Sequence, residues 1–259
     1  MKSFSLVLML VSGLFLTIFS ISKAAAQPRN NTFTVKADSL NLFDKSRNRL
    51  VPVALYLPSS GKKITAQQIV IFSHGYYQNL PGGNRKASYL TEALASQGYF
   101  VVSVQHELPT DSLIPSSGVP RIVRRPFWDR GADNILFVIN ELKKINPELD
   151  FKNITLIGHS NGGDMKALFP QKYPGLVSKI ITLDNRRMPL PKTGKLKVYS
   201  LRSSDQPADE AVLPTLEEQK RWNITIIKLP ATIHNDMDNR GKPEQQKEIV
   251  RYVSEFLNN

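Results

Sequence analysis

The sequence predicts an α/β protein: a doubly wound, mostly parallel sheet of about eight strands with helices on both faces. Short apolar runs, typical of buried strands, alternate along the chain with longer segments of helical spacing. This alternation favours parallel strands, because each helix crosses one face of the sheet between neighbouring strands. The chain also contains no cysteine, which excludes a disulfide framework, a thiolate metal site and a cysteine nucleophile.

The chain opens with two segments that alternate apolar and polar residues, Phe33–Leu40 and Arg49–Leu57, and these predict an antiparallel pair. Pro52 places the second strand near an edge of the sheet, since proline has no N–H to donate. The strands expected after this pair are Gln68–Phe72, Tyr99–Val104, the run beginning at Ile154, Lys179–Leu183, Leu196–Leu201 and Asn223–Leu229. The expected helices are Asn84–Ser96, Phe127–Lys144, Asn161–Phe169, Thr215–Trp222 and Pro243–Leu257.

The N-terminal segment Met1–Ala26 has the pattern of a secretory signal peptide. Lys2 precedes an apolar run from Phe4 to Ile21, and three alanines end the segment. We expect cleavage after Ala26, a single domain over residues 27–259, and a secreted or periplasmic protein. The apolar run is also about long enough to span a bilayer, so an uncleaved membrane anchor is the alternative.

The chain is basic, with 34 lysines and arginines against 22 acidic residues and a formal net charge of +12. In a secreted protein this charge favours an anionic envelope surface, a polysaccharide or an acidic substrate as partner. Nucleic-acid-binding motifs are absent, so no nucleic acid is expected, and a merely solvated basic surface is an equally good explanation. The positive charge is concentrated at Arg121, Arg124, Arg125, Arg130, Arg186 and Arg187.

The segment Gly158-His159-Ser160-Asn161-Gly162 fits the pattern G-x-S-x-G. An apolar strand precedes it and a helical pattern follows it, which is the context of a sharp turn that exposes a serine hydroxyl above a sheet. The elbow glycines, Gly158 and Gly162, leave room for that turn because they have no side chain. The alternative for this motif is a glycine-rich turn with a solvated serine.

From Gln68 to Leu257 the order of elements and this motif resemble the α/β-hydrolase superfamily, most closely its small secreted or periplasmic serine esterases. The superfamily places a nucleophile, an acid and a histidine in that order along the chain. The resemblance implies Ser160 as nucleophile and His234 as general base, since His234 is the only histidine after Ser160. It implies neither a cofactor nor a metal, and His106 has no second histidine at a ligand spacing.

Three aspartates between Ser160 and His234 lie near strand ends. Asp205 follows the strand Leu196–Leu201 by four residues, where most members of the superfamily place the acid, and the resemblance favours it. Asp184 ends the preceding strand, a position that some lipases use, and is the alternative acid. Asp209 lies deeper in its loop and is better suited to capping or solvent contact. The expected triad is Ser160, His234 and Asp205.

The resemblance also implies an oxyanion hole formed by the backbone N–H groups of Asn161 and Tyr76. Because His74-Gly75 is followed by two tyrosines rather than by glycines, the second donor is also open to Gly75 or Tyr77. The proline-rich residues 105–126 are long for a plain connection, which suggests a lid or entrance loop. There Arg121, Arg124 and Arg125 are candidates for attracting anionic substrates or surfaces.

The sequence thus favours a carboxylic-ester hydrolase acting on a small or polymeric ester through an acyl-enzyme. Lipase, thioesterase and peptidase chemistry remain open, because a serine nucleophile serves all of them. A non-catalytic envelope or carbohydrate-binding protein on the same scaffold is the second class of function. The sequence leaves the oligomeric state open.

Overall fold

The computed structural model describes residues 33–59 and 64–259. The expected signal peptide, residues 1–26, lies outside the described residues. The strands are β1 (Thr34–Asp44), β2 (Arg49–Ser59), β3 (Gln68–Ser73), β4 (Phe100–Val104), β5 (Asp150–His159), β6 (Lys179–Leu183), β7 (Lys197–Arg202) and β8 (Ile224–Lys228). The helices are α1 (Ser88–Ser96), α2 (Pro120–Val123), α3 (Arg125–Ile145), α4 (Asn161–Lys172), α5 (Leu216–Trp222) and α6 (Pro243–Asn258), with 3₁₀ turns η1 (Gly83–Arg85) and η2 (His234–Met237).

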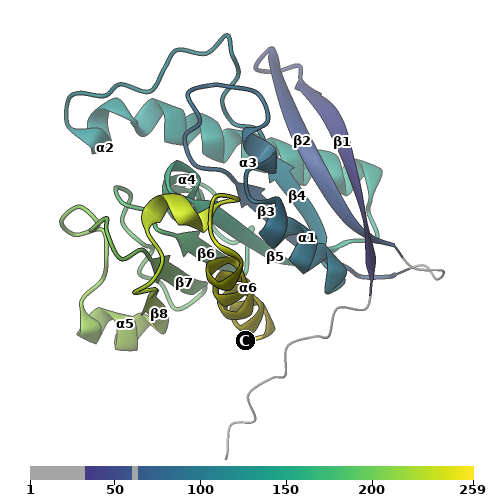
Figure 1. Cartoon of the computed structure of the whole chain (residues 1–259). Helices are drawn as coiled ribbons and strands as arrows, with labels where there is room; N and C mark the ends of the chain where they lie inside the picture. The colour runs from purple at the N-terminus through teal and green to yellow at the C-terminus, as the bar shows by residue number, and fades with distance from the viewer. Residues whose placement is uncertain (1–32, 60–63) are drawn as a thin grey trace, which may run out of the picture.

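The strands form one eight-stranded sheet in the order β1-β2-β4-β3-β5-β6-β7-β8 (Figure 1). β1 pairs antiparallel with β2, and β2 pairs antiparallel with β4. Every pair from β4 through β8 is parallel. The mostly parallel, doubly wound sheet predicted from the sequence is therefore confirmed, with the opening hairpin at its edge.

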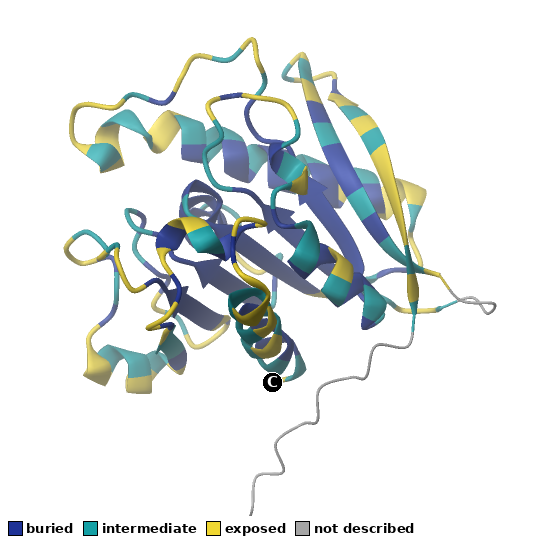
Figure 2. Ribbon diagram, in the orientation of Figure 1, coloured by how far each residue is buried: buried dark blue, intermediate teal, exposed yellow. Residues whose placement is uncertain are grey.

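The parallel strands are buried on both faces, which explains why their sequences are continuously apolar. Ile69 and Ile71 of β3 pack toward α3 and α4, whereas Val70 and Phe72 pack toward α1 and α6. Figure 2 shows the central strands buried, the edge strand β1 largely exposed, and the outward sides of the helices exposed. The two apolar layers fix the positions of the central strands, from whose carboxyl ends the loops of the site start.

Two local features differ from the sequence expectation. α4 continues through Pro170 to Lys172, although the helix was expected to end at Phe169. Pro170 removes only one N–H donor from the helix. The next turn is still closed, because the Tyr173 N–H donates to the Phe169 carbonyl. Residues 105–126 also contain the short helix α2, which begins at Pro120, where the fixed φ of proline suits the first helical turn.

In the part of the chain that the structure describes, we find no helix with the length and apolar character needed to span a bilayer. The parallel strands β3 to β8 all end at one edge of the sheet, so the loops that follow them share this edge. These loops carry the residues that the sequence analysis singled out.

Candidate active site

Ser160 stands at the turn between β5 and α4, as the motif predicts. Its backbone has φ 51° and ψ −118°, a conformation that costs a non-glycine residue of order 1–3 kcal/mol. Two hydrogen bonds hold it there. The Ser160 N–H donates to the Leu183 carbonyl at 2.9 Å, and the Ser160 carbonyl accepts from the Asp164 N–H at 3.0 Å. The strain is thus maintained by β6 on one side and by the first turn of α4 on the other.

The two elbow glycines are required because backbone atoms pass directly against them. A Cβ placed on Gly158 would lie 2.4 Å from the Gly162 carbonyl oxygen, and one on Gly162 would lie 2.3 Å from the Ser73 carbonyl oxygen. Backbone atoms cannot move aside as a flexible side chain can. Any larger residue at either position would push α4 away from β3 and β5 and displace Ser160.

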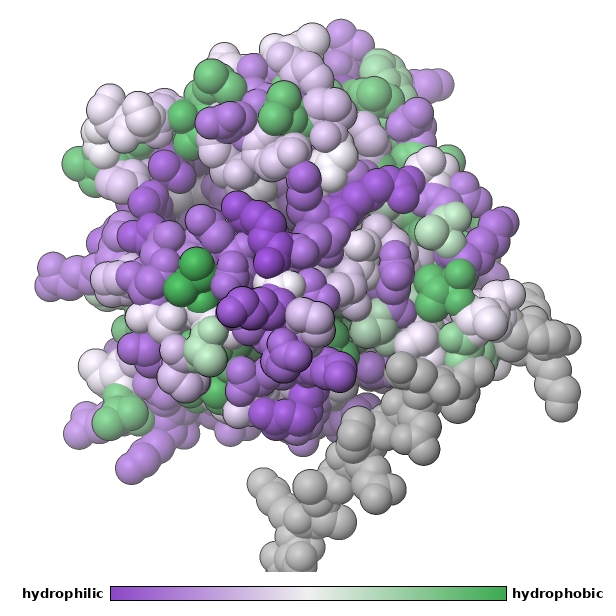
Figure 3. Space-filling view, in the orientation of Figure 1, coloured by the Kyte–Doolittle hydropathy of each residue, from purple (hydrophilic) through white to green (hydrophobic). Residues whose placement is uncertain are grey.

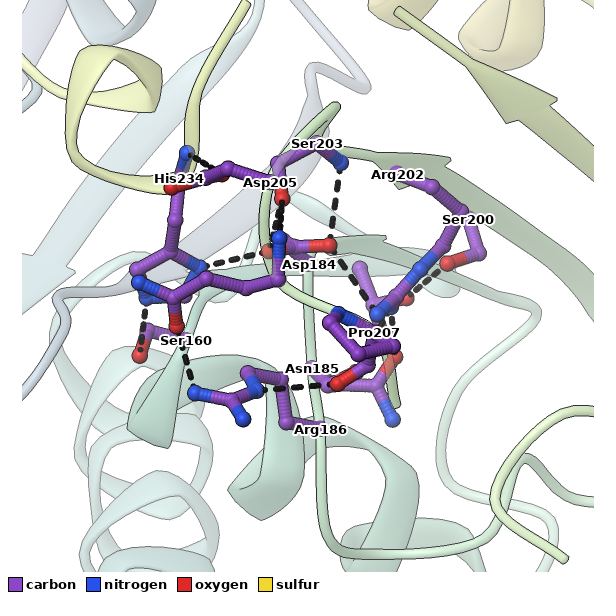
Figure 4. Close-up of polar contacts among 12 residues, drawn as sticks. Ser160, Asp184, Asn185, Arg186, Ser200, Arg202, Ser203, Asp205, Pro207 and His234 are labelled. Atoms are coloured by element: carbon purple, nitrogen blue, oxygen red, sulfur yellow. Dashed lines mark hydrogen bonds and ion pairs between the residues drawn. The ribbon is translucent and has the colours of Figure 1, made fainter. Parts of the chain in front are cut away.

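His234 begins the 3₁₀ turn η2 after β8 and lies between Ser160 and a buried carboxylate (Figure 4). Its Nε2 is 2.9 Å from Ser160 Oγ, and its Nδ1 is 2.5 Å from Asp184 Oδ2. The predicted contact between Ser160 and His234 is therefore present. A proton on Nδ1 shared with the carboxylate leaves Nε2 free to accept the proton of the serine hydroxyl.

The expected acid, Asp205, does not contact the imidazole. It is exposed, and its Oδ1 accepts the backbone N–H of His234 at 2.7 Å. The position at Nδ1 belongs to Asp184, the alternative weighed from the sequence. The assignment of Asp205 is corrected on this geometry: Asp184, directly after β6, lies beside the ring at Nδ1, whereas the loop after β7 carries Asp205 to the start of η2 (Figure 4).

Asp184 is fully buried and surrounded by donors. Ser203 gives it two hydrogen bonds, from N–H at 3.0 Å and from Oγ at 2.7 Å, and Arg202 Nη2 lies 2.9 Å from Oδ1. Burial by itself would raise the pKa of this carboxyl. The hydrogen bond with His234, the Arg202 charge and the bonds from Ser203 outweigh burial, so the pKa lies below its usual value. Asp184 is therefore a carboxylate at neutral pH.

His159 contacts His234 in a way that the sequence analysis did not anticipate. Its buried ring lies with its centroid 4.9 Å from that of His234, and its Nε2 donates to the His234 carbonyl at 3.0 Å. Burial, with the nearby His234 as a second cause, lowers the pKa of His159 to about 4. His159 thus supports the His234 loop as a neutral residue. It occupies a position that the G-x-S-x-G pattern leaves unspecified, so the pattern contained no signal for it.

The two residues proposed for the oxyanion hole flank Ser160. Asn161 follows it directly at the start of α4, and Tyr76 and Ser160 line one pocket, which is described below. The loop of Tyr76 passes very close to the serine, since a Cβ on Gly75 would lie 3.3 Å from Ser160 Cβ. Both expected donors are in the right region, and their role in charge stabilisation stays a prediction.

A pocket of about 480 Å³ opens beside Ser160, a size typical of small-molecule sites. Figure 3 shows that the face of the molecule in this view is mostly hydrophilic, with hydrophobic residues scattered over it. The described lining residues are Phe72, His74, Gly75, Tyr76, Tyr77, Lys86, Ala87, His159, Ser160, His234, Asn235, Asp238, Asn239 and Arg240.

None of these lining residues belongs to the expected entrance segment, residues 105–126. That segment nevertheless touches the site, because the Ile114 N–H donates to the Tyr76 hydroxyl at 3.1 Å. Arg124 is half-buried, and burial followed by the neighbouring Arg187 charge lowers its pKa. Arg121 and Arg125 are exposed. The function of the segment as a lid or entrance stays a prediction.

Comparisons with known proteins concern the fold of the chain. No family model matches the chain. A Drosophila melanogaster protein described as a "Probable serine hydrolase" is 26% identical over 124 residues, which are 47% of this chain and 38% of that protein. The match thus spans about two fifths of the length of this curated relative.

Solved structures resemble the chain over most of its length. The esterase Est22 superposes with a TM-score of 0.64 at 12% identity, over 87% of this chain and 82% of Est22. P91, a dienelactone hydrolase-like promiscuous phosphotriesterase from metagenomic libraries, gives 0.61 at 16% identity, over 87% and 98%. A dienelactone hydrolase from Anabaena variabilis gives 0.56 at 14% identity, over 86% and 97%. Together with the sheet order and the serine elbow, these similarities show that the chain has the α/β-hydrolase fold.

Proposed function

We propose that this protein is a serine hydrolase that cleaves carboxylic esters through a triad of Ser160, His234 and Asp184. The observation that carries the proposal is the unbroken chain of contacts from Ser160 Oγ through both ring nitrogens of His234 to the buried Asp184 carboxylate. A solvated serine on an ordinary turn needs none of these partners. A purely structural role for His234 would not explain why a serine with a strained backbone lies at its second ring nitrogen.

The chemistry follows from this arrangement. His234 Nε2 accepts the Ser160 proton as Oγ attacks the ester carbonyl, and Asp184 stabilises the imidazolium that forms. The backbone N–H groups of Asn161 and Tyr76 stabilise the oxyanion of the tetrahedral intermediate. Collapse expels the alcohol, which takes the proton from His234 and leaves an acyl-enzyme. Water, activated by the same histidine, then releases the acid and restores Ser160.

The names of the similar structures, among them an esterase and a dienelactone hydrolase, support an ester as the substrate class. The pocket of about 480 Å³ suits a small ester better than a long acyl chain. A panel of p-nitrophenyl esters of increasing acyl length, run beside a thioester, a lipid ester and a peptide amide, separates esterase from thioesterase, lipase and peptidase activity. We expect turnover to be highest with the short esters.

The nucleophile is tested by labelling with a fluorophosphonate, which reacts with activated serines. The wild type should be labelled at Ser160. Ser160→Ala should fold normally, lose labelling and lose about 10⁴–10⁶ in turnover. Ser39→Ala, which removes an exposed hydroxyl from β1 away from the pocket, is the matched control and should keep both. A folded wild type that is neither labelled nor active would instead support a non-catalytic envelope protein.

We propose further that the protein is secreted or periplasmic, on the composition of Met1–Ala26. Expression from the full sequence should yield a product whose N-terminal sequence begins at Gln27 and whose mass is that of residues 27–259. A product in the membrane fraction that retains Met1 would indicate the anchor alternative.

A further inference from the structure

Glu107 is a buried carboxyl group that the chemistry above does not use. It follows β4 by three residues and is 1% exposed. Burial raises its pKa. Burying a carboxyl group costs desolvation free energy, which only its hydrogen bonds and charge partners can offset. Its surroundings therefore indicate what it is for.

One oxygen of Glu107 holds the side chain of the residue after the nucleophile. Glu107 Oε1 accepts from Asn161 Nδ2 at 3.1 Å, and Asn161 Oδ1 accepts from the Trp128 indole N–H at 2.8 Å. Glu107, Asn161 and Trp128 are all buried. With its side chain held at both ends, Asn161 has little freedom to rotate at the start of α4. Its backbone N–H is the expected first donor of the oxyanion hole.

The other oxygen of Glu107 faces the loop that carries the expected second donor. Oε2 is 3.7 Å from Nε2 of the buried His74 and has no hydrogen-bond partner among the described residues. His74 Nε2 accepts the His106 N–H at 3.3 Å, and His74 Nδ1 donates to the Gly75 carbonyl at 2.6 Å. The Gly75 carbonyl and the Tyr76 N–H belong to one planar peptide group. Orienting the carbonyl therefore orients the N–H.

We propose that Glu107 is a positioning residue for the oxyanion hole. Its hydrogen bond holds the Asn161 side chain and with it the donor on α4, whereas the Gly75–Tyr76 peptide is held by His74 Nδ1. This inference rests on the proposed function and adds a residue that touches neither the substrate nor Ser160. Burial raises the pKa of Glu107 and the charge of Arg130 acts to lower it, but among the described residues the ion pair of Arg130 is with Asp111, at 3.4 Å.

Misaligned donors stabilise the transition state less well but hardly affect binding of the ester, because the negative charge develops only during the reaction. Glu107→Leu should therefore lower kcat about 10- to 100-fold and change KM less than about twofold. This fall in kcat is smaller than the fall of about 10²–10³-fold that is typical of losing a donor outright. Glu107→Gln should stay within about threefold of wild type, because its amide oxygen can still accept from Asn161.

The experiment measures kcat and KM for a p-nitrophenyl ester together with the affinity of a trifluoromethyl ketone, which forms a tetrahedral oxyanion on the serine. In Glu107→Leu the affinity of the ketone should fall by about the same factor as kcat. The matched control is Gln97→Leu, which removes another buried polar side chain, one bonded to Ser254 and away from the pocket. It should lower thermal stability and leave kcat and ketone affinity unchanged.

Asn161→Ala breaks the same contact from the other side and serves if Glu107→Leu does not fold. It should give the same fall in kcat at nearly constant KM. Unchanged kcat and ketone affinity in either folded variant would overturn the proposal, as would a Gln variant no better than the Leu variant. If the wild type itself fails to react with fluorophosphonate, the proposed function has failed, and that outcome is distinct from failure of the Glu107 inference.

Discussion

Two neighbouring loops at the edge of the sheet each bring an aspartate to His234, and the two aspartates do different work. Asp184, just after β6, is fully buried and contacts the imidazole Nδ1. Asp205, after β7, is exposed and accepts the backbone N–H of the same histidine. Proximity to the histidine is therefore not enough to identify the acid. Only a carboxylate at Nδ1 can set the ring tautomer and stabilise the imidazolium.

The second loop holds the position of the histidine loop rather than the ring. The Ser204 N–H donates to the Thr232 carbonyl at 2.8 Å, two residues before His234. Asp205 then closes the first turn of η2 from the same side. The loop after β6 sets the tautomer and charge stabilisation of the imidazole, and the loop after β7 holds the segment that carries it. Mutations in the first loop should therefore lower kcat, and mutations in the second should mainly lower stability.

Within this comparison of the two loops, the largest effect is expected for Asp184→Asn. The amide can still occupy the space, but it presents no charge to the imidazolium and favours the wrong tautomer, so kcat should fall by about 10²–10⁴-fold. Kinetics with a p-nitrophenyl ester, together with thermal unfolding, measure it. A fall in kcat for Asp205→Asn larger than that for Asp184→Asn would reverse the comparison.

The support of the histidine loop by His159 is expected to appear as a pH-dependent stability. The pKa of His159 is about 4 in the folded protein against an ordinary value of 6.5. Between these values the unfolded chain binds a proton that the folded chain does not, so stability falls as the pH drops. At pH 5 this costs about 2 kcal/mol relative to neutral pH.

Denaturant unfolding of the wild type and of His159→Gln at pH 7.5 and pH 5 measures this difference. Glutamine does not titrate but can still donate to the His234 carbonyl. The variant should lose about 2 kcal/mol less stability than the wild type on acidification. Equal losses in the two proteins would mean that His159 is not held neutral.

A smaller effect is expected for Asp205→Ala, which removes the acceptor of the His234 N–H. By analogy with helix caps, the free energy of unfolding should fall by about 1 kcal/mol, and kcat should fall by no more than about tenfold. Asp205→Asn keeps an acceptor oxygen and should be nearly silent. Chemical denaturation and ester kinetics on both variants test whether this aspartate acts on the loop alone.

The smallest effect is expected in the entrance segment. Replacing Arg121, Arg124 and Arg125 together by glutamine should raise KM for acidic esters a few-fold more than for neutral esters, and the difference should shrink with salt. A triple Lys→Gln variant at Lys143, Lys152 and Lys195, exposed residues away from the pocket, is the control. Equal changes with acidic and neutral esters would assign these arginines to a solvated surface.

Most of the fold and part of the site could be predicted from the sequence. Strands and helices were identified within a few residues, because burial on one face imposes a period on the sequence and burial of a strand on both faces gives a continuous apolar run. The elbow was predictable because only glycine tolerates the backbone contacts at Gly158 and Gly162. His234 was predictable because no other histidine follows Ser160.

The choice of the acid was decided only by the tertiary structure. Asp184 and Asp205 both follow strands that end at the same edge of the sheet, so the sequence places both near His234. The direction of each side chain depends on backbone angles, and Asp184 has φ 58°, a left-handed conformation that no sequence pattern announced. The partners that keep it charged, Arg202 and Ser203, lie on the adjacent strand β7 and directly after it.

The buried contacts around the nucleophile depended still more on the fold. Glu107 and Asn161 are 54 residues apart, and His159 donates to a carbonyl 75 residues away. The sequence by itself determined which residue would be exposed on the elbow, because that is a local requirement of backbone geometry. Which side chains hold the elbow and the histidine was decided by the tertiary placement of α3, α4 and the loops after β4 and β8 next to the elbow. Hydrogen bonds between such distant segments leave no periodic signal in the chain.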